Sequence, residues 1–147
     1  MTEKPQPEKL SKEVWLYDPE KNEWVKGYRS DIVRLPQVYE LQWTAVGVTT
    51  DVAPDRDVEI PVEKARDIAI QADTTHASNT STSIDVNVEC ELGNGKWDTI
   101  PYAEMNLGDN EIKTMLISAG PFKIRLRVDN NTAASTGYVK ATVKVRE

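Results

Sequence analysis

Apolar and polar residues alternate with a period of two along most of the chain after residue 57. Such alternation is typical of antiparallel strands that pack one face in a core and expose the other face to water. We therefore expect strands whose inward positions form the core of the fold. The core positions that the alternation marks most clearly are Ile68, Ile70, Val86, Val88, Ile124, Leu126, Val143 and Val145.

Weaker strand signals extend or connect these runs. The run that contains Val86 continues to Cys90 and Leu92, which we also expect to face inward. The segment Glu111–Ser118 ends in a continuous apolar run, so we expect cover on both of its faces. The segment Trp97–Tyr102 is expected to form a shorter and weaker strand.

Turn-forming residues occur between the runs, at 93–95, 108–110, 120–121 and 129–131. Strands that recur every 8–12 residues or so with turns between them are typical of an all-β sandwich or barrel. No segment shows the 3.6-residue periodicity of a helix. Half-exposed strands bury their apolar faces against a second sheet, so the sequence predicts an antiparallel β-sandwich. Jelly-roll and immunoglobulin-like topologies both remain open.

The N-terminal third contains a hairpin signal. The aromatic runs Val14–Tyr17 and Trp24–Tyr28 flank the segment Asp18–Asn22, which begins with the turn-forming pair Asp-Pro. A lone hairpin is only marginally stable in water, so this one must be buried against something else. Both faces of its strands are apolar, and one sheet surface can cover only one of them.

The remaining face of the hairpin is the partner-binding surface that we predict. Its candidate residues are Trp15, Tyr17, Trp24 and Tyr28. Large aromatic side chains bury much surface and carry much of the binding energy at many interfaces. Exposed aromatic rings also stack on the faces of sugars, so a carbohydrate ligand is the alternative; the aromatic residues that favour it lie both in the N-terminal third and, as Trp97, Tyr102 and Tyr138, in the expected sandwich.

The chain divides into three expected parts. Residues 1–12 are polar and charged, and we expect a flexible arm. Residues 13–50 are expected to hold the hairpin and one or two further strands. Residues 49–56 are the expected linker, and residues 57–147 the expected β-sandwich domain.

Composition narrows the classes of partner. The chain of 147 residues has 18 Lys+Arg and 24 Asp+Glu, so its net charge is −6. With no basic run to neutralise phosphates, we expect no nucleic-acid partner. The hydrophobic share of 39% is below the roughly 45–50% of typical domains, which indicates tails, loops or a surface covered in an oligomer. No apolar run approaches the ~18 residues of a membrane span, and the polar N-terminus predicts no secretory signal.

Side chains that could carry chemistry are sparse. One cysteine allows no internal disulfide, and with one histidine it leaves no usual zinc ligand set. His76 lies in a small polar loop and is expected to be solvated, whereas Cys90 is expected to act as a small apolar residue. The runs at 109–111 and 129–131 match no calcium-binding loop, so we expect turns there. We expect no enzyme, no catalytic residue and no cofactor.

Four segments carry a family resemblance. They are WLYDPEKNEWVKG at 15–27, IDVNVE at 84–89, GPFKIRLRVDN at 120–130 and VKVR at 143–146. In these segments the chain resembles small β-sandwich proteins of the virions of tailed bacteriophages. The resemblance implies a structural protein of the virion, assembled in the host cytoplasm, and most specifically a capsid decoration (cement) protein. A tail or fibre component is another option. It further implies a homo-oligomer, with a trimer favoured, that binds and stabilises the major capsid protein lattice.

Two hypotheses of different classes follow. A non-enzymatic assembly protein accounts for the low apolar share, the polar arm and the acidic balance. A carbohydrate-binding β-sandwich module accounts for the aromatic residues. The sequence favours the first hypothesis.

Overall fold

The computed structural model of the chain describes residues 14–18, 23–27, 35–118, 120–121 and 123–147. The chain divides into two units, Met1–Arg34 and Leu35–Glu147, and each is described by itself. In the first unit, β1 (Val14–Asp18) and β2 (Glu23–Gly27) pair antiparallel in a two-stranded sheet of their own. The predicted hairpin is therefore confirmed, whereas the expected arm, residues 1–12, lies outside the described residues.

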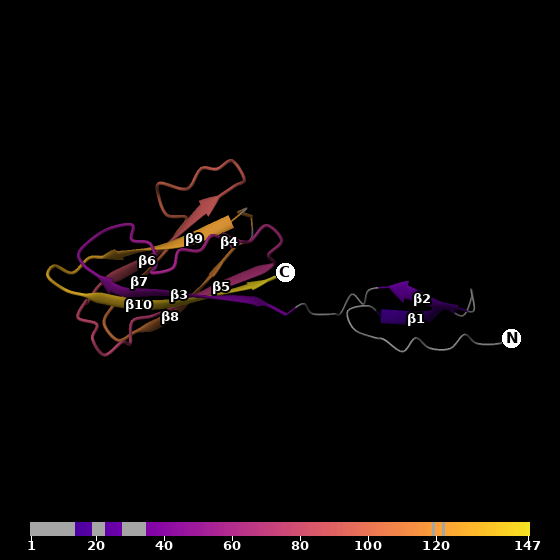
Figure 1. Cartoon of the computed structure of the whole chain (residues 1–147), viewed down its shortest axis with the longest axis horizontal. Helices are drawn as coiled ribbons and strands as arrows, with labels where there is room; N and C mark the ends of the chain where they lie inside the picture. Colours follow the sequence, from indigo (N-terminus) through magenta and orange to yellow (C-terminus); the bar gives the residue numbers. More distant parts are fainter. Residues whose placement is uncertain (1–13, 19–22, 28–34, 119, 122) are drawn as a thin grey trace. The chain divides into compact units, whose positions relative to one another are not determined.

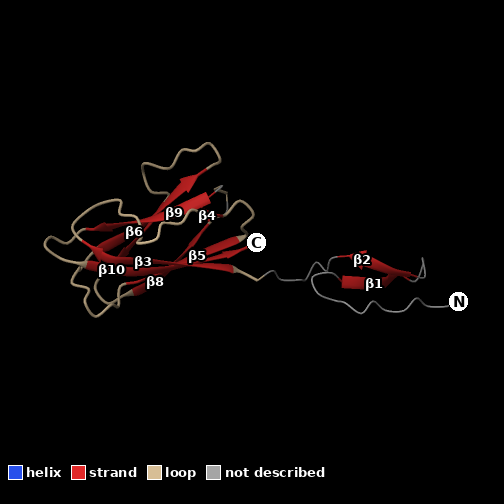
Figure 2. Ribbon diagram, in the orientation of Figure 1, coloured by secondary structure: helices blue, strands red, loops and turns tan. Residues whose placement is uncertain are grey.

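The second unit is an antiparallel β-sandwich, and the residues described in it contain no helix (Figures 1 and 2). Sheet I has the order β3 (Gln37–Val46), β10 (Gly137–Arg146), β5 (Asp67–Asp73), β8 (Ile112–Ile117). Sheet II has the order β4 (Ile60–Pro61), β9 (Lys123–Asn130), β6 (Ile84–Glu91), β7 (Ala103–Leu107). The predicted all-β class is confirmed.

The strand order decides between the two topologies that the sequence left open. The first strand of the sandwich pairs with the last (β3 with β10), and the second with the last but one (β4 with β9). The same nesting continues inward, with β5 beside β8 and β6 beside β7. The chain therefore has the topology of one long hairpin of four successive strand pairs that is folded into two sheets. This is the strand order of a jelly roll. An immunoglobulin-like domain would distribute its strands differently.

The two sheets bury one core between them. All eight core positions predicted from the alternation are buried, with at most 4% of their surface exposed. Cys90 is buried as well, as expected. The expectation for Leu92 was wrong, because β6 ends at Glu91 and the side chain of Leu92, in the following turn, is 71% exposed.

The sandwich begins earlier than the expected boundary at residue 57. β3 is a full member of sheet I and pairs with β10 along nearly its whole length, so residues 37–46 belong to the sandwich unit. The expected linker, residues 49–56, is also part of this unit. Val52 forms a bridge with Val128 of β9, and its carbonyl oxygen accepts a hydrogen bond of 2.9 Å from the Trp43 indole. The segment therefore joins the margins of the two sheets.

Two strand expectations need correction. β8 is the edge strand of sheet I, and its Leu116 is 79% exposed, so the apolar run at its end is not covered on both faces. The segment Trp97–Tyr102 forms no strand; it contributes an isolated bridge between Glu91 and Trp97, and the backbone N–H groups of Asp98 and Tyr102 donate hydrogen bonds to β6. The strand forms instead directly after it, as β7, where Met105 and Leu107 are buried.

Candidate functional site

The predicted partner-binding residues belong to the N-terminal hairpin. The register of β1 and β2 places Tyr17 opposite Trp24 and Trp15 opposite Lys26. Residues directly opposite in an antiparallel pair occupy the same face of the ladder. Trp15, Tyr17 and Trp24 therefore hold adjoining positions on one face, while the fourth candidate, Tyr28, lies outside the described residues.

Sheet II has an outer face that is covered by charged side chains and loops. Arg127 of β9 is only 7% exposed, and its guanidinium donates two hydrogen bonds of 3.0 Å to the two carboxylate oxygens of Asp57. Lys123 forms an ion pair of 3.2 Å with Glu59 in the same segment. These pairs fix the chain before β4 against the sheet, and the two-point geometry of the Arg127 pair makes it the more specific contact.

The loop after β6 covers the rest of this face. The buried carboxylate of Glu91 accepts hydrogen bonds from the backbone N–H groups of Gly93 and Gly95. The Arg125 guanidinium lies 4.4 Å from the centroid of the Trp97 ring, a cation–π contact. Trp97 was expected to lie in a strand, but it lies in the loop after β6, and its ring contacts the Arg125 guanidinium.

Glu89 lies under this cover as well. Its carboxylate accepts a hydrogen bond of 2.8 Å from Arg125 Nε. Burial raises the pKa of Glu89, and the neighbouring carboxyl group of Asp51 raises it further, while Arg125 acts in the opposite direction. The group therefore holds a proton more readily in the folded protein than in an unfolded chain.

Cys90 lies on the opposite, inward side of β6. Burial, together with the nearby carboxylate of Asp98, raises the pKa of the Cys90 thiol to about 11. A thiol with a raised pKa holds little thiolate at neutral pH and is a poor nucleophile. The structure thus supports the expectation that Cys90 acts as a packing residue.

The outer face of sheet I is open. Register places Lys140 of β10 opposite Gln42 of β3 on one side and opposite Asp73 of β5 on the other. Farther along β10, Lys144 lies between Val38 and Ala69. No described segment covers these outward residues, and Lys140 and Lys144 are both exposed.

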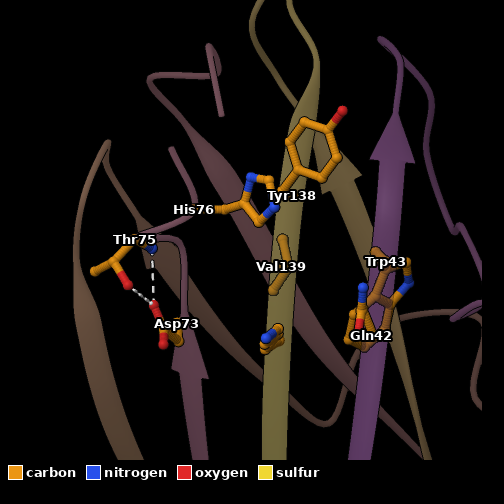
Figure 3. A pocket seen from close by; sticks show the side chains of 8 residues that line it. Gln42, Trp43, Asp73, Thr75, His76, Tyr138 and Val139 are labelled. Carbon is orange, nitrogen blue, oxygen red and sulfur yellow. Dashed lines mark hydrogen bonds between the residues drawn. The ribbon is translucent and has the colours of Figure 1, made fainter. Parts of the chain in front are cut away.

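A pocket of about 250 Å³ lies on this open face, at the end of β5 (Figure 3). Its floor is the row of Gln42, Lys140 and Asp73, and its wall contains His76 and Tyr138. The two rings are stacked, with centroids 4.3 Å apart and planes inclined by 16°.

A β-bulge shapes the pocket. The register of β3 and β10 shifts between Gly137 and Val139, so Thr44 and Ala45 together lie opposite Tyr138. Such a bulge bends the strand and changes the direction of neighbouring side chains. Asp55 holds the bulge in place, because its carboxylate accepts hydrogen bonds from both the backbone N–H and the hydroxyl of Thr44.

Sequence reasoning missed this pocket. His76 was expected to be a solvated loop residue, and it is exposed, but its ring is fixed by the stack on Tyr138 and by a hydrogen bond of 3.1 Å from the Ser78 N–H to Nδ1. The outward positions of Lys140 and Tyr138 follow from alternation. Their juxtaposition with Gln42 and His76 depends on strand register and on the bulge, which one sequence does not show.

Other site classes find no support in the part of the chain that the structure describes. No group of His, Cys, Asp or Glu residues there could hold a metal ion. Residues 109–111 form a turn, and residues 129–131 are the end of a strand. The buried side-chain amide of Asn130 donates a hydrogen bond to the Val46 carbonyl and accepts one from the Ser81 hydroxyl. No helix among the described residues is long and apolar enough to cross a membrane.

Comparisons with known proteins were made for family, sequence and structure. No family model and no curated protein sequence matches the chain. Among solved structures, it is similar to the SPBc2 prophage-derived protein YomS, with 20% identity and a TM-score of 0.45 over 79% of this chain and 98% of that one. It is also similar to PirA, with 12% identity and a TM-score of 0.40 over 80% of this chain and 98% of that one.

A third similar chain comes from Bacillus endospore appendages, which form disulfide-linked pili. It has 8% identity and a TM-score of 0.40 over 82% of this chain and 97% of that one. Similarity at this level assigns no function.

Proposed function

We propose that this chain is a non-enzymatic structural protein of a tailed-phage virion, and specifically a decoration protein that binds and stabilises the capsid lattice. The observation that carries the proposal is the N-terminal hairpin, which forms a sheet of its own in a unit separate from the sandwich. A two-stranded sheet is marginally stable in water without further burial. A hairpin of this kind is stabilised by a surface that covers it, and in this proposal the capsid lattice supplies that surface.

The register of the hairpin supports a binding role. Trp15, Tyr17 and Trp24 hold adjoining positions on one face of the ladder. Trp and Tyr are enriched among the residues that dominate binding at protein interfaces, where truncation of a central one costs ~2 kcal/mol or more. The hairpin is thus the binding unit and the jelly roll is the body that it attaches to the lattice.

Exposed apolar residues of the sandwich support a second set of contacts in an assembly. Leu116 and Ile112 on the edge strand β8 are 79% and 55% exposed. Ile100, in the loop before β7, is 80% exposed. An exposed apolar edge strand is a liability in an isolated protein, and a neighbouring subunit of a trimer would cover it.

The test is lattice binding by the double variant Trp15→Ala/Trp24→Ala. Loss of both rings should weaken binding to capsids of the phage that encodes the chain by at least about 100-fold. The matched control is Leu92→Ala/Tyr102→Ala, which also truncates two large exposed side chains, but in the sandwich and outside the proposed assembly contacts. The control should bind like the parent. Equal binding by both variants would contradict the proposal.

A further inference from the structure

We propose that the pocket on sheet I binds one residue of a neutral polysaccharide. The proposal does not depend on the lattice-binding role, because it uses the sandwich and not the hairpin. It narrows the sugar-binding alternative drawn from the sequence, which rested on the aromatic residues of the whole chain, to one pocket and to the polar groups that line it.

Two side chains of the pocket floor, Gln42 and Lys140, have no hydrogen-bond or ion-pair partner among the described residues. Lys140 lies opposite Asp73 in the register, yet the two form no ion pair. The side-chain amide of Gln42 likewise makes no hydrogen bond to a described residue. Arg146 and Asp67, directly opposite each other at the other end of the same two strands, do form an ion pair of 2.6 Å. The floor therefore presents an ammonium donor between an amide and a carboxylate.

The wall adds groups with fixed directions. Asp73 Oδ1 accepts hydrogen bonds from the backbone N–H of Thr75, at 2.7 Å, and from its hydroxyl, at 2.5 Å, which leaves Oδ2 for a ligand (Figure 3). The Ser78 N–H donates to Nδ1 of His76, so the neutral ring carries its proton on Nε2. Nε2 is thus a donor on a ring that the stack on Tyr138 holds in place.

This mixture of groups selects the ligand class. The carboxylate of Asp73 would repel an anion, and the ammonium group of Lys140 would repel a cation, so neither suits the pocket. A hydrophobic ligand would need a predominantly apolar lining. A sugar hydroxyl both donates and accepts hydrogen bonds, and the apolar face of a sugar ring packs on an aromatic ring. The floor and the Tyr138 wall together satisfy both requirements.

The size of the pocket limits how much of the ligand it holds. Its volume of about 250 Å³ is below the roughly 300–1,000 Å³ of sites for drug-sized ligands. One sugar ring therefore enters, and the rest of the polysaccharide stays in solvent. We expect a dissociation constant on the order of 1 mM for a monosaccharide. Many copies on one lattice would raise the overall avidity without new contacts.

The experiment titrates the full chain with methyl glycosides of glucose, galactose, mannose and N-acetylglucosamine, and follows backbone amides by NMR. At least one glycoside should shift the amides of residues 75–77 and 138–140. Lys140→Met should weaken that binding at least about tenfold, and Asp73→Asn, which keeps the acceptor for Thr75, should do the same. The matched control is Lys144→Met, on the same strand and the same open face, which should bind like the parent.

Three results would overturn the proposal. They are no shift with any glycoside, equal binding by Lys140→Met and Lys144→Met, and shifts of the same amides by inorganic phosphate in place of the sugars. Melting curves establish that each variant is folded. The hairpin variant Trp15→Ala/Trp24→Ala should still bind the glycoside, so failure of this proposal is distinguishable from failure of the lattice-binding role.

Discussion

The two sheets of the jelly roll are built from similar alternating strands, yet their outer faces differ. On sheet II the outward residues Glu89, Glu91 and Arg127 are buried, because residues 51–59 and 91–98 lie against them. On sheet I the corresponding outward lysines are exposed and carry no cover from described residues. One face is a closed, ion-paired layer, and the other is open to a ligand.

The difference shows what each face is suited to do. Buried charges that are paired and hydrogen-bonded hold loops in one arrangement, and removal of one partner leaves the other charge without compensation. Exposed polar groups that bind only water can exchange those hydrogen bonds for equivalent ones to a ligand. Sheet II is therefore the rigid support of the fold, and sheet I is the face on which the proposed sugar pocket lies.

The largest expected effect lies in the core that both faces share. Val86 is fully buried between the sheets, so Val86→Asp places a charge among apolar side chains with no partner. We expect a loss of about 4 kcal/mol or more in the free energy of unfolding, measured by urea denaturation. Gln71→Asp, at an exposed outward position of sheet I, is the control; it removes the hydrogen bond to Thr114 and should cost no more than about 1.5 kcal/mol. A parent-like Val86→Asp would mean that the strand register is wrong.

The next effect compares the two outer faces directly. Arg127→Ala removes the buried guanidinium that holds Asp57 through two hydrogen bonds. We expect a loss of about 2 kcal/mol, less than for a fully buried pair because Asp57 is 46% exposed. Lys144→Ala on sheet I should change the unfolding free energy by no more than about 0.5 kcal/mol. Equal losses in urea denaturation would remove the distinction between the faces.

The smallest effect is a change in pH dependence at Glu89. Its pKa is raised in the folded protein, so its contribution stabilises the fold below the unfolded pKa and is lost as the pH rises through the folded pKa. Glu89→Gln keeps an acceptor for Arg125 and removes the titration. The variant should therefore gain stability relative to the parent as the pH rises from 4 to 7, as followed by thermal melting. A constant difference across this range would show that Glu89 does not titrate as described.

Alternation predicted the sheet class and the inward positions well, because period-two burial is a local property of a strand. It failed at Leu92 and Leu116, where the strand end and the sheet edge decide exposure. It also could not show that the charged outward residues of β6 and β9 are covered. That cover depends on loops from distant parts of the chain, such as the contact of Asp57 with Arg127.

The candidate sites were predictable to different degrees. The local sequence predicted the hairpin, since its two aromatic runs lie on either side of an Asp-Pro turn. The pocket brings together Gln42, His76 and Lys140 from three separate segments, and its shape depends on a bulge. The nested order of a jelly roll creates these neighbours, and strand order is a long-range property that local patterns do not determine.

The central claim is that the N-terminal unit binds the lattice while the jelly roll is an independent body. It is tested most directly by comparing the full chain with residues 35–147, both for melting temperature and for cosedimentation with capsids of the phage that encodes the chain. We expect the same melting temperature for both proteins and lattice binding by the full chain alone. Binding by residues 35–147 at the affinity of the full chain would contradict the account and place the interface on the sandwich.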